Sequence, residues 1–298
     1  MVKSNTISRR NFIKGSAGAV GVLGMTGLSW GEDKPKRTAT DPVVLGKSGV
    51  VVSRLAMGTG THNGQIQHDL GQEKFNKLVL YANERGITFF ETAENYGGMH
   101  EMLGKAVKLL DRDKIQLQTK IPWWKQPDPV KTLDRYRKEL NTDYFDTLLI
   151  HCVTTAEWAE EQKHLMEFLE NAKEKGLVRA PGVSIHGRYP LDATADLAWG
   201  DVRMVRINHN GNTMDKFNRE GEVDVNACVA EIKKMHDAGK GIIGMKLIGN
   251  GTFKDPEVRK QSIKFVMGLD CVDCVSIGFK SPQEIDEAMD NMNRYLNI

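Results

Sequence analysis

The chain has 298 residues, of which 40% are hydrophobic and 27% are charged. That composition is typical of a globular protein with enough apolar residues for a large core, and it excludes a wholly disordered chain. The 41 basic and 39 acidic side chains leave a net charge of only +2, which gives no electrostatic reason to expect nucleic acid or anionic lipid as a partner.

The N-terminal 30 residues have the pattern of an export leader. Ser8 to Lys14 reads Ser-Arg-Arg-Asn-Phe-Ile-Lys, and a weakly apolar, glycine-rich run from Gly15 to Trp30 follows. The arrangement resembles a bacterial twin-arginine signal, although a disordered tail with a chance Arg-Arg pair is an alternative. The run is too short and too rich in glycine to make a good permanent membrane span. We therefore expect a signal over residues 1–30, the twin-arginine export machinery as a partner and a periplasmic location, with an uncleaved, weakly anchoring leader as the alternative.

Residues 31–42 are polar and contain proline, which predicts a linker between the leader and the folded part. The remainder, residues 43–298, is close to the roughly 250 residues of a typical (β/α)8 barrel. Its first ten residues, Val43 to Val52, predict a β-hairpin that turns at Lys47-Ser48-Gly49 and caps the floor of the barrel.

Short apolar runs then alternate with amphipathic stretches to the end of the chain, which predicts parallel strands joined by helices. The expected strands are Arg54–Gly58, Ile87–Phe90, Ile115–Thr119, Phe145–Ile150, Val178–Val183, Met204–Ile207, Ile242–Met245 and Cys274–Ile277. The expected helices begin near Glu73, His100, Asp128, Glu161, Leu191, Asn226, Pro256 and Pro282. Eight such pairs favour a single (β/α)8 barrel over an open, doubly wound sheet, which would need a glycine-rich turn after its first strand.

Ionisable side chains follow three consecutive predicted strands. Glu91 and Tyr96 come after the second strand, Lys120 after the third and His151 after the fourth. The active site of such a barrel lies at the carboxyl ends of its strands, so these four side chains are the candidate catalytic group.

Around these positions the chain resembles the aldo-keto reductase family. The family pattern Asp-Thr-Ala-x-x-Tyr-Gly is matched by residues 91–97, its Thr-Lys by Thr119-Lys120, and its Asp-Tyr-hydrophobic-Asp-x-x-x-x-His by residues 143–151. Further matched pieces span the mature chain in the family's order: residues 45–49, 176–179, 182–184 and 276–281. The resemblance implies a (β/α)8 oxidoreductase that transfers a hydride between a nicotinamide cofactor and an aldehyde, ketone or sugar-like carbonyl.

In that chemistry Tyr96 is the proton donor for the developing alkoxide. A free phenol has a pKa of about 10, so a neighbouring Lys120 would help it to ionise reversibly. Glu91 would hold the lysine charged and in place, and the resemblance implies that His151 orients the substrate carbonyl. The family has Asp where this chain has Glu91. The extra methylene lengthens the reach of the carboxylate, and such a change predicts altered or weak activity unless something compensates.

Each of the four side chains also has a purely structural interpretation. Tyr96 could be a packed aromatic, Lys120 a snorkelling strand-end lysine, His151 a core histidine and Glu91 a charge at a helix N-terminus. We favour the catalytic interpretation because four complementary groups at adjacent strand ends are an improbable coincidence.

The resemblance also implies a cofactor, NADP with NAD as the alternative. The matched cofactor-binding positions are Gly58, Thr59, Ser184, Met245, Lys246, Leu247, Gly278, Phe279, Lys280 and Ser281. Lys246 and Lys280 could bind phosphates, whereas Glu284 would repel a 2′-phosphate nearby. Arg206, His186 and His209 are expected near the barrel mouth, where they could shape substrate binding or serve as loop and packing residues.

We expect no metal site. Cys271 and Cys274 are the closest pair of the four cysteines, but on an extended strand they would point to opposite faces. Two other functions stay open: a catalytically weak, nucleotide-binding barrel with a regulatory role, and a lyase or isomerase that uses Glu91 and His151 as acid and base.

Overall fold

The computed structural model describes residues 36–125, 128–214 and 223–298. The predicted leader and the first part of the predicted linker therefore lie outside the described residues. Within the described ranges, no helix combines the length and the apolar character that a membrane crossing requires.

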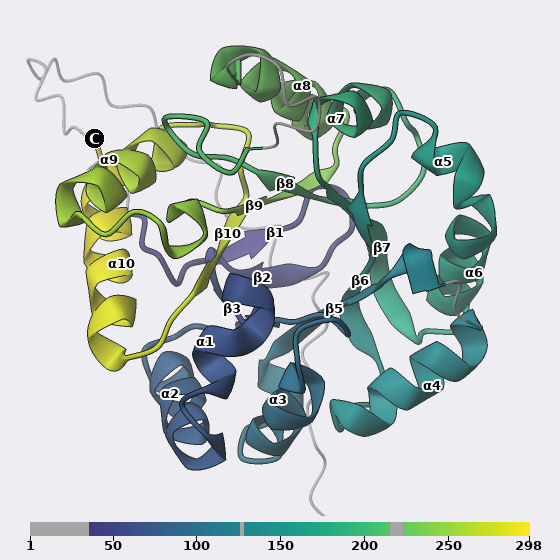
Figure 1. The fold of residues 1–298 in the computed structure, drawn as a ribbon, viewed down its shortest axis with the longest axis horizontal. Helices are drawn as coiled ribbons and strands as arrows, with labels where there is room; N and C mark the ends of the chain where they lie inside the picture. The colour runs from purple at the N-terminus through teal and green to yellow at the C-terminus, as the bar shows by residue number, and fades with distance from the viewer. Residues whose placement is uncertain (1–35, 126–127, 215–222) are drawn as a thin grey trace, which may run out of the picture. The chain divides into compact units, whose positions relative to one another are not determined.

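Eight parallel strands close into a barrel, and helices surround it (Figure 1). Around the barrel each strand pairs with the next, and the last, β10, pairs with the first, β3. The strands are β3 Leu55–Gly58, β4 Phe89–Glu91, β5 Gln116–Ile121, β6 Phe145–Val153, β7 Val178–Ile185, β8 Val202–Arg206, β9 Gly241–Met245 and β10 Cys274–Gly278. The predicted (β/α)8 barrel is confirmed, and the open-sheet alternative is wrong.

Every predicted strand is present, but several have different ends. β5, β6 and β7 extend two or three residues further toward the barrel mouth than the apolar runs that predicted them. The added residues include polar ones: Lys120 pairs with Leu149 on the next strand, and His151 lies between two paired residues of β6. β8 begins at Val202 rather than Met204. Its second residue, Arg203, is fully buried, and its guanidinium donates to the backbone carbonyls of Leu197 and Trp199. The apolar pattern did not predict this start of the strand because Arg203 is a charged residue.

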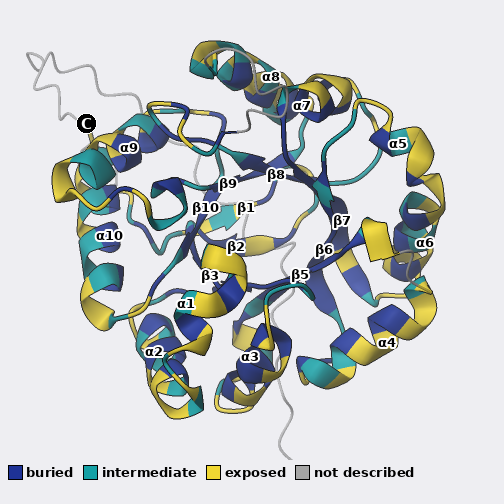
Figure 2. Cartoon of the chain, viewed as in Figure 1, coloured by how far each residue is buried: buried dark blue, intermediate teal, exposed yellow. Residues whose placement is uncertain are grey.

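Each of the eight predicted helix starts lies within three residues of a helix start in the structure, but the short α1 was not predicted. The helices are α1 Gln65–His68, α2 Gln72–Glu84, α3 Met99–Val107, α4 Pro129–Glu139, α5 Trp158–Glu161, α6 Lys163–Glu174, α7 Arg188–Ala195, α8 Val225–Asp237, α9 Pro256–Met267 and α10 Pro282–Tyr295. Asp128, Asp224, Asp255 and Ser281 cap α4, α8, α9 and α10 by accepting hydrogen bonds from backbone N–H groups of the first turn. Each longer helix buries the side that faces the strands and exposes the other (Figure 2).

The apolar core has two parts, one between the strands and the helices and one inside the barrel. The inner part includes Phe89, Leu149 and Ile243 from the strands, together with Leu45 and Val52 from the hairpin. The hairpin consists of β1 Pro42–Val44 and β2 Val51–Ser53, which pair antiparallel. Because its apolar side chains join the inner core, the hairpin closes the floor of the barrel as predicted, and the mouth is left at the other end.

The folded part begins before residue 43. Arg37 to Asp41 were assigned to the linker from their polarity, but Ala39 is fully buried and its N–H donates to Asn293 on α10. Arg37 also exchanges hydrogen bonds with Asn297, since its N–H donates at 2.7 Å and its carbonyl accepts at 2.8 Å. A polar composition therefore concealed a segment that packs by hydrogen bonding and by the apolar contact of Ala39 with the core.

Candidate active site

The four candidate catalytic side chains meet at the mouth of the barrel. Glu91 ends β4, Lys120 lies near the end of β5, His151 lies in β6, and Tyr96 lies in the loop between β4 and α3. Glu91, Lys120 and His151 are almost completely buried. The three strands are adjacent, so their parallel pairing carries the side chains to one edge of the barrel.

Lys120 is the centre of this group. Its Nζ donates to the Glu91 carboxylate through Oε1, to the Thr92 carbonyl at 3.0 Å and to the Tyr96 hydroxyl at 3.3 Å. The predicted lysine, carboxylate and phenol are thus brought into direct contact.

The second oxygen of Glu91 has its own partner. Ser276 on β10 donates its hydroxyl to Oε2 at 3.0 Å. Sequence reasoning missed this serine. Two signals were present: Ser276 begins the matched piece 276–281, and it is a polar residue between the apolar Val275 and Ile277 in a predicted strand.

The electrostatics correct one expectation from the sequence. Burial, and after it the negative charge of Glu91, raises the pKa of Tyr96 well above its ordinary value. Burial also lowers the pKa of Lys120, against the attraction of Glu91. Burial and the Glu91 charge therefore outweigh the lowering of the phenol pKa that the sequence led us to expect from Lys120. Tyr96 is held protonated, which is the form that a proton donor needs.

His151 is a neutral imidazole beside the phenol. Burial lowers its pKa well below the ordinary value, and the positive charges of Lys120, Lys246 and Arg206 lower it further. Its ring meets that of Tyr96 edge to face, with 5.7 Å between the centroids. Its Nδ1 is buried and has no hydrogen-bond partner among the residues that the structure describes.

Next to His151, side chains from β6, from β8 and from the residue that follows β7 contact one another. Nδ1 of His186 lies 2.6 Å from Nη2 of Arg206 and 3.0 Å from Sγ of Cys152. Burial and the charge of Arg206 lower the pKa of His186 well below its ordinary value. Arg206 and His186 thus lie at the mouth as expected, whereas His209 packs edge to face on Phe253.

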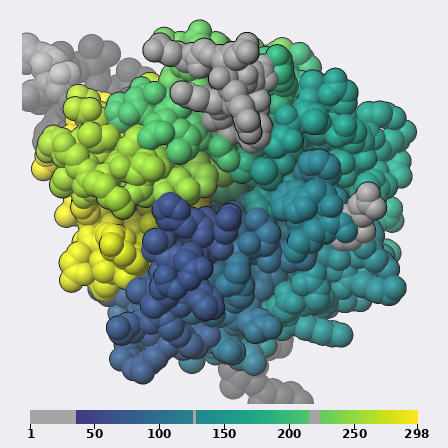
Figure 3. All heavy atoms as spheres, viewed as in Figure 1, coloured from purple at the N-terminus to yellow at the C-terminus, as the bar shows by residue number. Residues whose placement is uncertain are grey.

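Two cavities run from the phenol along the ends of β3, β9 and β10. The inner one, about 90 Å³, is lined by Tyr96 and Glu91 and by the predicted Gly58, Met245, Lys246, Leu247 and Gly278. The outer one, about 300 Å³, is lined by Arg259, Glu284 and Glu287 and by the predicted Gly278, Phe279 and Lys280. They share Thr61, Ile248, Gly251, Ile277 and Gly278, so together they form one elongated groove. Its rim is formed by the segments after β3 and β9, which meet near the middle of this face (Figure 3).

The other three predicted cofactor-binding residues are not among those that line the two cavities, and they differ in what their hydroxyls do. Thr59 donates to the Glu91 carbonyl at 3.1 Å, and Ser281 caps α10. Ser184 is fully buried, and its Oγ has no hydrogen-bond partner within the described parts of the chain. A buried hydroxyl without a partner is costly, so Ser184 is the one of the three that is available to a ligand.

Charges at the outer end of the groove are balanced within the protein. Arg259 forms a bidentate pair with Glu287, with its Nε at 2.6 Å and its Nη2 at 2.9 Å from the carboxylate oxygens. Nζ of Lys280 lies 3.8 Å from Glu284. Of the two lysines proposed for phosphates, Lys246 lies in the inner cavity, where it donates to Asn250 at 2.8 Å.

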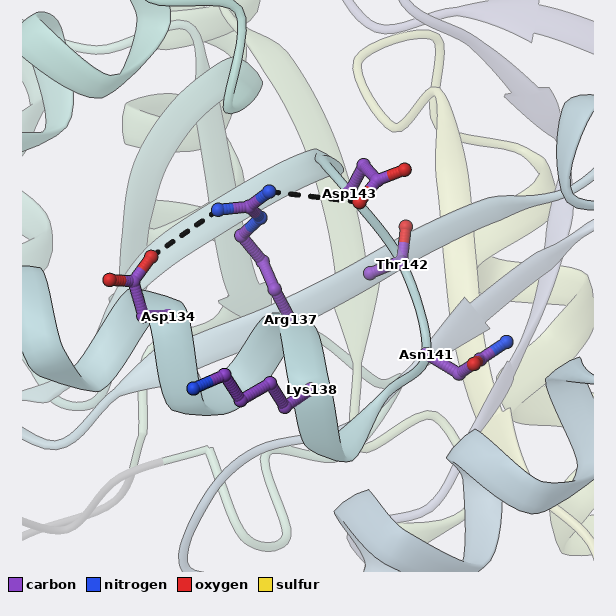
Figure 4. Close-up of a pocket in the computed structure, with 6 residues that line it drawn as sticks. All are labelled: Asp134, Arg137, Lys138, Asn141, Thr142 and Asp143. Carbon is purple, nitrogen blue, oxygen red and sulfur yellow. Dashed lines mark hydrogen bonds and ion pairs between the residues drawn. The ribbon is translucent and has the colours of Figure 1, made fainter.

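A larger hollow lies away from this chemistry, at the end of α4 and the segment before β6 (Figure 4). Arg137 in its wall pairs with Asp134 and Asp143. These residues precede β6, whereas the candidate catalytic side chains lie at the ends of the strands, so we do not assign the hollow to the active site.

The cysteines and acidic residues do not suggest a metal centre. In the described ranges, no three or more His, Cys, Asp and Glu side chains form a group that could hold a metal ion. The argument that Cys271 and Cys274 point to opposite faces of one extended strand is wrong, because Cys271 precedes β10 and is not part of the strand. Both Cys271 and Cys274 are buried free thiols.

The fold and the buried Lys–Glu–Tyr contact at the mouth define a barrel with a preformed acid–base site. The family model described as aldo/keto reductase family matches residues 54–268. This chain belongs to the aldo/keto reductase family.

Relatives and solved structures agree with that assignment. An aldo-keto reductase of Bacillus subtilis, YhdN, is 30% identical over 238 residues, which cover 74% of this chain and 69% of that one. The probable aldo-keto reductase 1 of Glycine max is 35% identical over 175 residues, and the match spans about half of each chain, 51% and 49%. A solved putative aldo-keto reductase from Pseudomonas aeruginosa has the same fold, with a TM-score of 0.70, 20% identity and coverage of 87% and 98%.

Proposed function

We propose that the protein reduces a carbonyl substrate with a nicotinamide cofactor and that Tyr96 is the proton donor. The observation that carries the proposal is the contact of Tyr96 with Lys120, at 3.3 Å, beside a neutral histidine at the end of an elongated groove. The family to which the chain belongs supports the same reaction class.

Each of the four side chains has a separate task in this reaction. The cofactor, when bound, supplies the hydride. Tyr96 donates its proton to the developing alkoxide, and Lys120 stabilises the phenolate that remains. Glu91 keeps Lys120 charged. His151, which is neutral, donates a hydrogen bond to the carbonyl oxygen from the ring nitrogen that carries its proton.

We assign the cofactor to the groove and favour NADP, with NAD as the alternative. Ser184, whose buried hydroxyl has no partner among the described residues, and the backbone at Gly58 and Gly278 fit a planar amide and an extended dinucleotide. A structurally similar reductase from Klebsiella pneumoniae was solved in complex with NADP and acetate, with a TM-score of 0.59 and 17% identity. Lys280 supports binding of a 2′-phosphate, whereas Glu284 beside it opposes such binding.

Turnover of a simple aldehyde tests the function. Methylglyoxal is a suitable probe because a 32% identical Escherichia coli relative is named a methylglyoxal reductase. The full chain should oxidise NADPH in its presence, and Tyr96→Phe should lower kcat by on the order of 10²–10⁴ while nucleotide binding persists. Nucleotide binding is measured by fluorescence titration.

Tyr81→Phe is the matched control. Tyr81 donates to Asp286 on α10, away from the strand ends, so removing its hydroxyl should leave kcat unchanged. Equal rates for wild type and Tyr96→Phe would refute the assignment of the proton donor. Tight nucleotide binding without any turnover would favour a binding or regulatory barrel instead, and no nucleotide binding would favour a lyase or isomerase.

We further propose that the chain is exported through the twin-arginine route to the periplasm, folded and with its cofactor bound. The support is the Ser8 to Lys14 motif and the apolar run after it, both outside the described residues. Replacing Arg9 and Arg10 with lysine should retain the protein in the cytoplasm, as measured by fractionation. Periplasmic protein that carries no nucleotide would contradict the cofactor part of this proposal.

A further inference from the structure

The Glu91 carboxylate is held at both of its oxygens by two different strands. Oε1 accepts from Lys120 on β5, and Oε2 accepts from the Ser276 hydroxyl on β10 at 3.0 Å. The exposed fraction of Glu91 is 3% and that of Ser276 is 8%, so water does not compete strongly for either bond. A hydrogen bond to an ionised acceptor is among the stronger kinds in proteins.

The bond from Ser276 crosses a whole strand. β3 lies between β4 and β10, and its Gly58 pairs with Glu91 on one side and Gly278 on the other. A Cβ at residue 58 would lie 2.5 Å from Ser276 Oγ and 2.9 Å from Glu91 Oε2. Only glycine therefore leaves room for the hydroxyl and the carboxylate to meet above β3.

This arrangement matters because a glutamate has one more rotatable bond than an aspartate. A carboxylate held only by Lys120 could turn about that bond and carry the ammonium with it. The Lys120–Tyr96 distance of 3.3 Å is already long for a hydrogen bond, so a small further displacement would break it. The second anchor removes this freedom.

We infer that Ser276 is a positioning residue for the reduction. Its hydroxyl, donated above Gly58, fixes Glu91 so that the other carboxylate oxygen holds Lys120 against Tyr96, and this anchor compensates for the longer reach of Glu91. The inference rests on the proposed function, since it assigns Ser276 a role in the same site.

A double-mutant cycle between Ser276→Ala and Glu91→Asp tests the inference. In the protein that keeps Glu91, Ser276→Ala should lower kcat on the order of tenfold and leave KM for methylglyoxal nearly constant. This loss is smaller than the roughly 10² expected for a displacement of about 1 Å. In the Glu91→Asp chain the shorter carboxylate retracts from Ser276, so the same substitution should change kcat less than about twofold. Wild-type kcat for Ser276→Ala, or an equal loss in both backgrounds, would overturn the inference.

A second readout does not depend on turnover. The urea midpoints of the four proteins should be non-additive, with Ser276→Ala shifting the midpoint less when residue 91 is Asp. Ser53→Ala is the matched control, because Ser53 is a buried serine at the barrel floor whose hydroxyl donates to the Leu55 carbonyl and accepts from Thr88 and Phe89. It should lower the midpoint equally in both backgrounds and leave kcat unchanged.

The two readouts separate the possible failures. A wild-type chain that turns over no aldehyde would refute the proposed function, and the midpoints would still decide whether Ser276 and Glu91 are coupled. Additive midpoints would overturn the inference, whatever the activity.

Discussion

Lys120 is a fully buried cation that depends on one carboxylate for its charge balance. The ion pair between Lys120 and Glu91 stabilises the protein only while both partners are present, because removing either one leaves an uncompensated charge in the barrel. The remaining contacts of the ammonium, with the Thr92 carbonyl and the Tyr96 hydroxyl, are dipolar.

Lys120→Met should therefore destabilise the protein more than the double substitution Lys120→Met with Glu91→Gln. We expect the single change to lower the free energy of unfolding by about 3–5 kcal/mol, because it strands the Glu91 charge. The double change should recover part of that loss. Urea unfolding of the three proteins measures the difference, and a double variant less stable than the single one would contradict the argument.

The sequence predicted the residues whose positions follow from strand order alone. Glu91, Lys120 and His151 end or continue apolar runs, and Tyr96 follows one closely, so a parallel barrel necessarily brings them to one end. Ser276 could not be found in this way. Its role depends on the register of β10, β3 and β4 and on the missing side chain of Gly58, which a linear pattern does not contain.

The loop between β4 and α3 carries Tyr96 and is fastened to α4. Glu94 in this loop accepts from Tyr136 and, at 3.0 Å, from Arg135, both on α4. The Tyr136 hydroxyl also lies 3.3 Å from the carbonyl oxygen of Lys120 on β5. One buried phenol thus joins the element that carries the proton donor to the element that carries its lysine.

Tyr136→Phe should loosen this connection without removing any side chain from the site. We expect a several-fold lower kcat with an unchanged nucleotide affinity, and a loss of unfolding free energy of roughly 1–3 kcal/mol for the broken bond to a charged group. Steady-state kinetics and urea unfolding measure the two effects. Tyr144→Phe is the control, because Tyr144 stacks between Arg112 and Arg179 just before β6. An unchanged kcat for Tyr136→Phe would show that the loop needs no such fastening.

The existence and type of the eight strands and of the main helices after them were predictable, but their ends and the short α1 were not. Apolar periodicity located all eight strands and their helices, since each strand must bury side chains on both faces. The ends moved where a polar group is buried with a partner, namely the Arg203 guanidinium in β8 and the Ala39 backbone N–H before the hairpin. The partners of Arg203 are near in sequence and the partner of Ala39 is distant, but in both cases the bond depends on the fold and local composition does not reveal it.

At the scale of the whole molecule, buried histidines couple stability to pH. Burial lowers the pKa of His100, His151 and His186, although the pair with Glu139 opposes this effect at His100. Each histidine is neutral in the fold and takes up a proton in the unfolded chain below its ordinary pKa of about 6.5. The unfolded state therefore binds more protons in acid, and stability must fall as the pH drops below that value.

The urea midpoint should accordingly be nearly constant between about pH 7 and 8 and decrease steadily from about pH 6.5 to 5, before most carboxylates titrate. His186→Asn should reduce the slope in this window, because it removes one of the contributing imidazoles. Midpoints measured at a series of pH values provide the test. An unchanged slope in His186→Asn would mean that this imidazole is protonated in the fold as well.

The reciprocal hydrogen bonds between Arg37 and Asn297 place two residues from near the opposite ends of the described chain side by side. The chain therefore returns to its starting point after the eighth β–α unit, and the start and the end of the barrel lie next to each other, away from the mouth. A short peptide between this start and end would permit circular permutation, with new ends opened in another helix-to-strand connection. The geometry around Tyr96 would survive such a rearrangement, because it depends on which strands are neighbours and not on where the polypeptide starts.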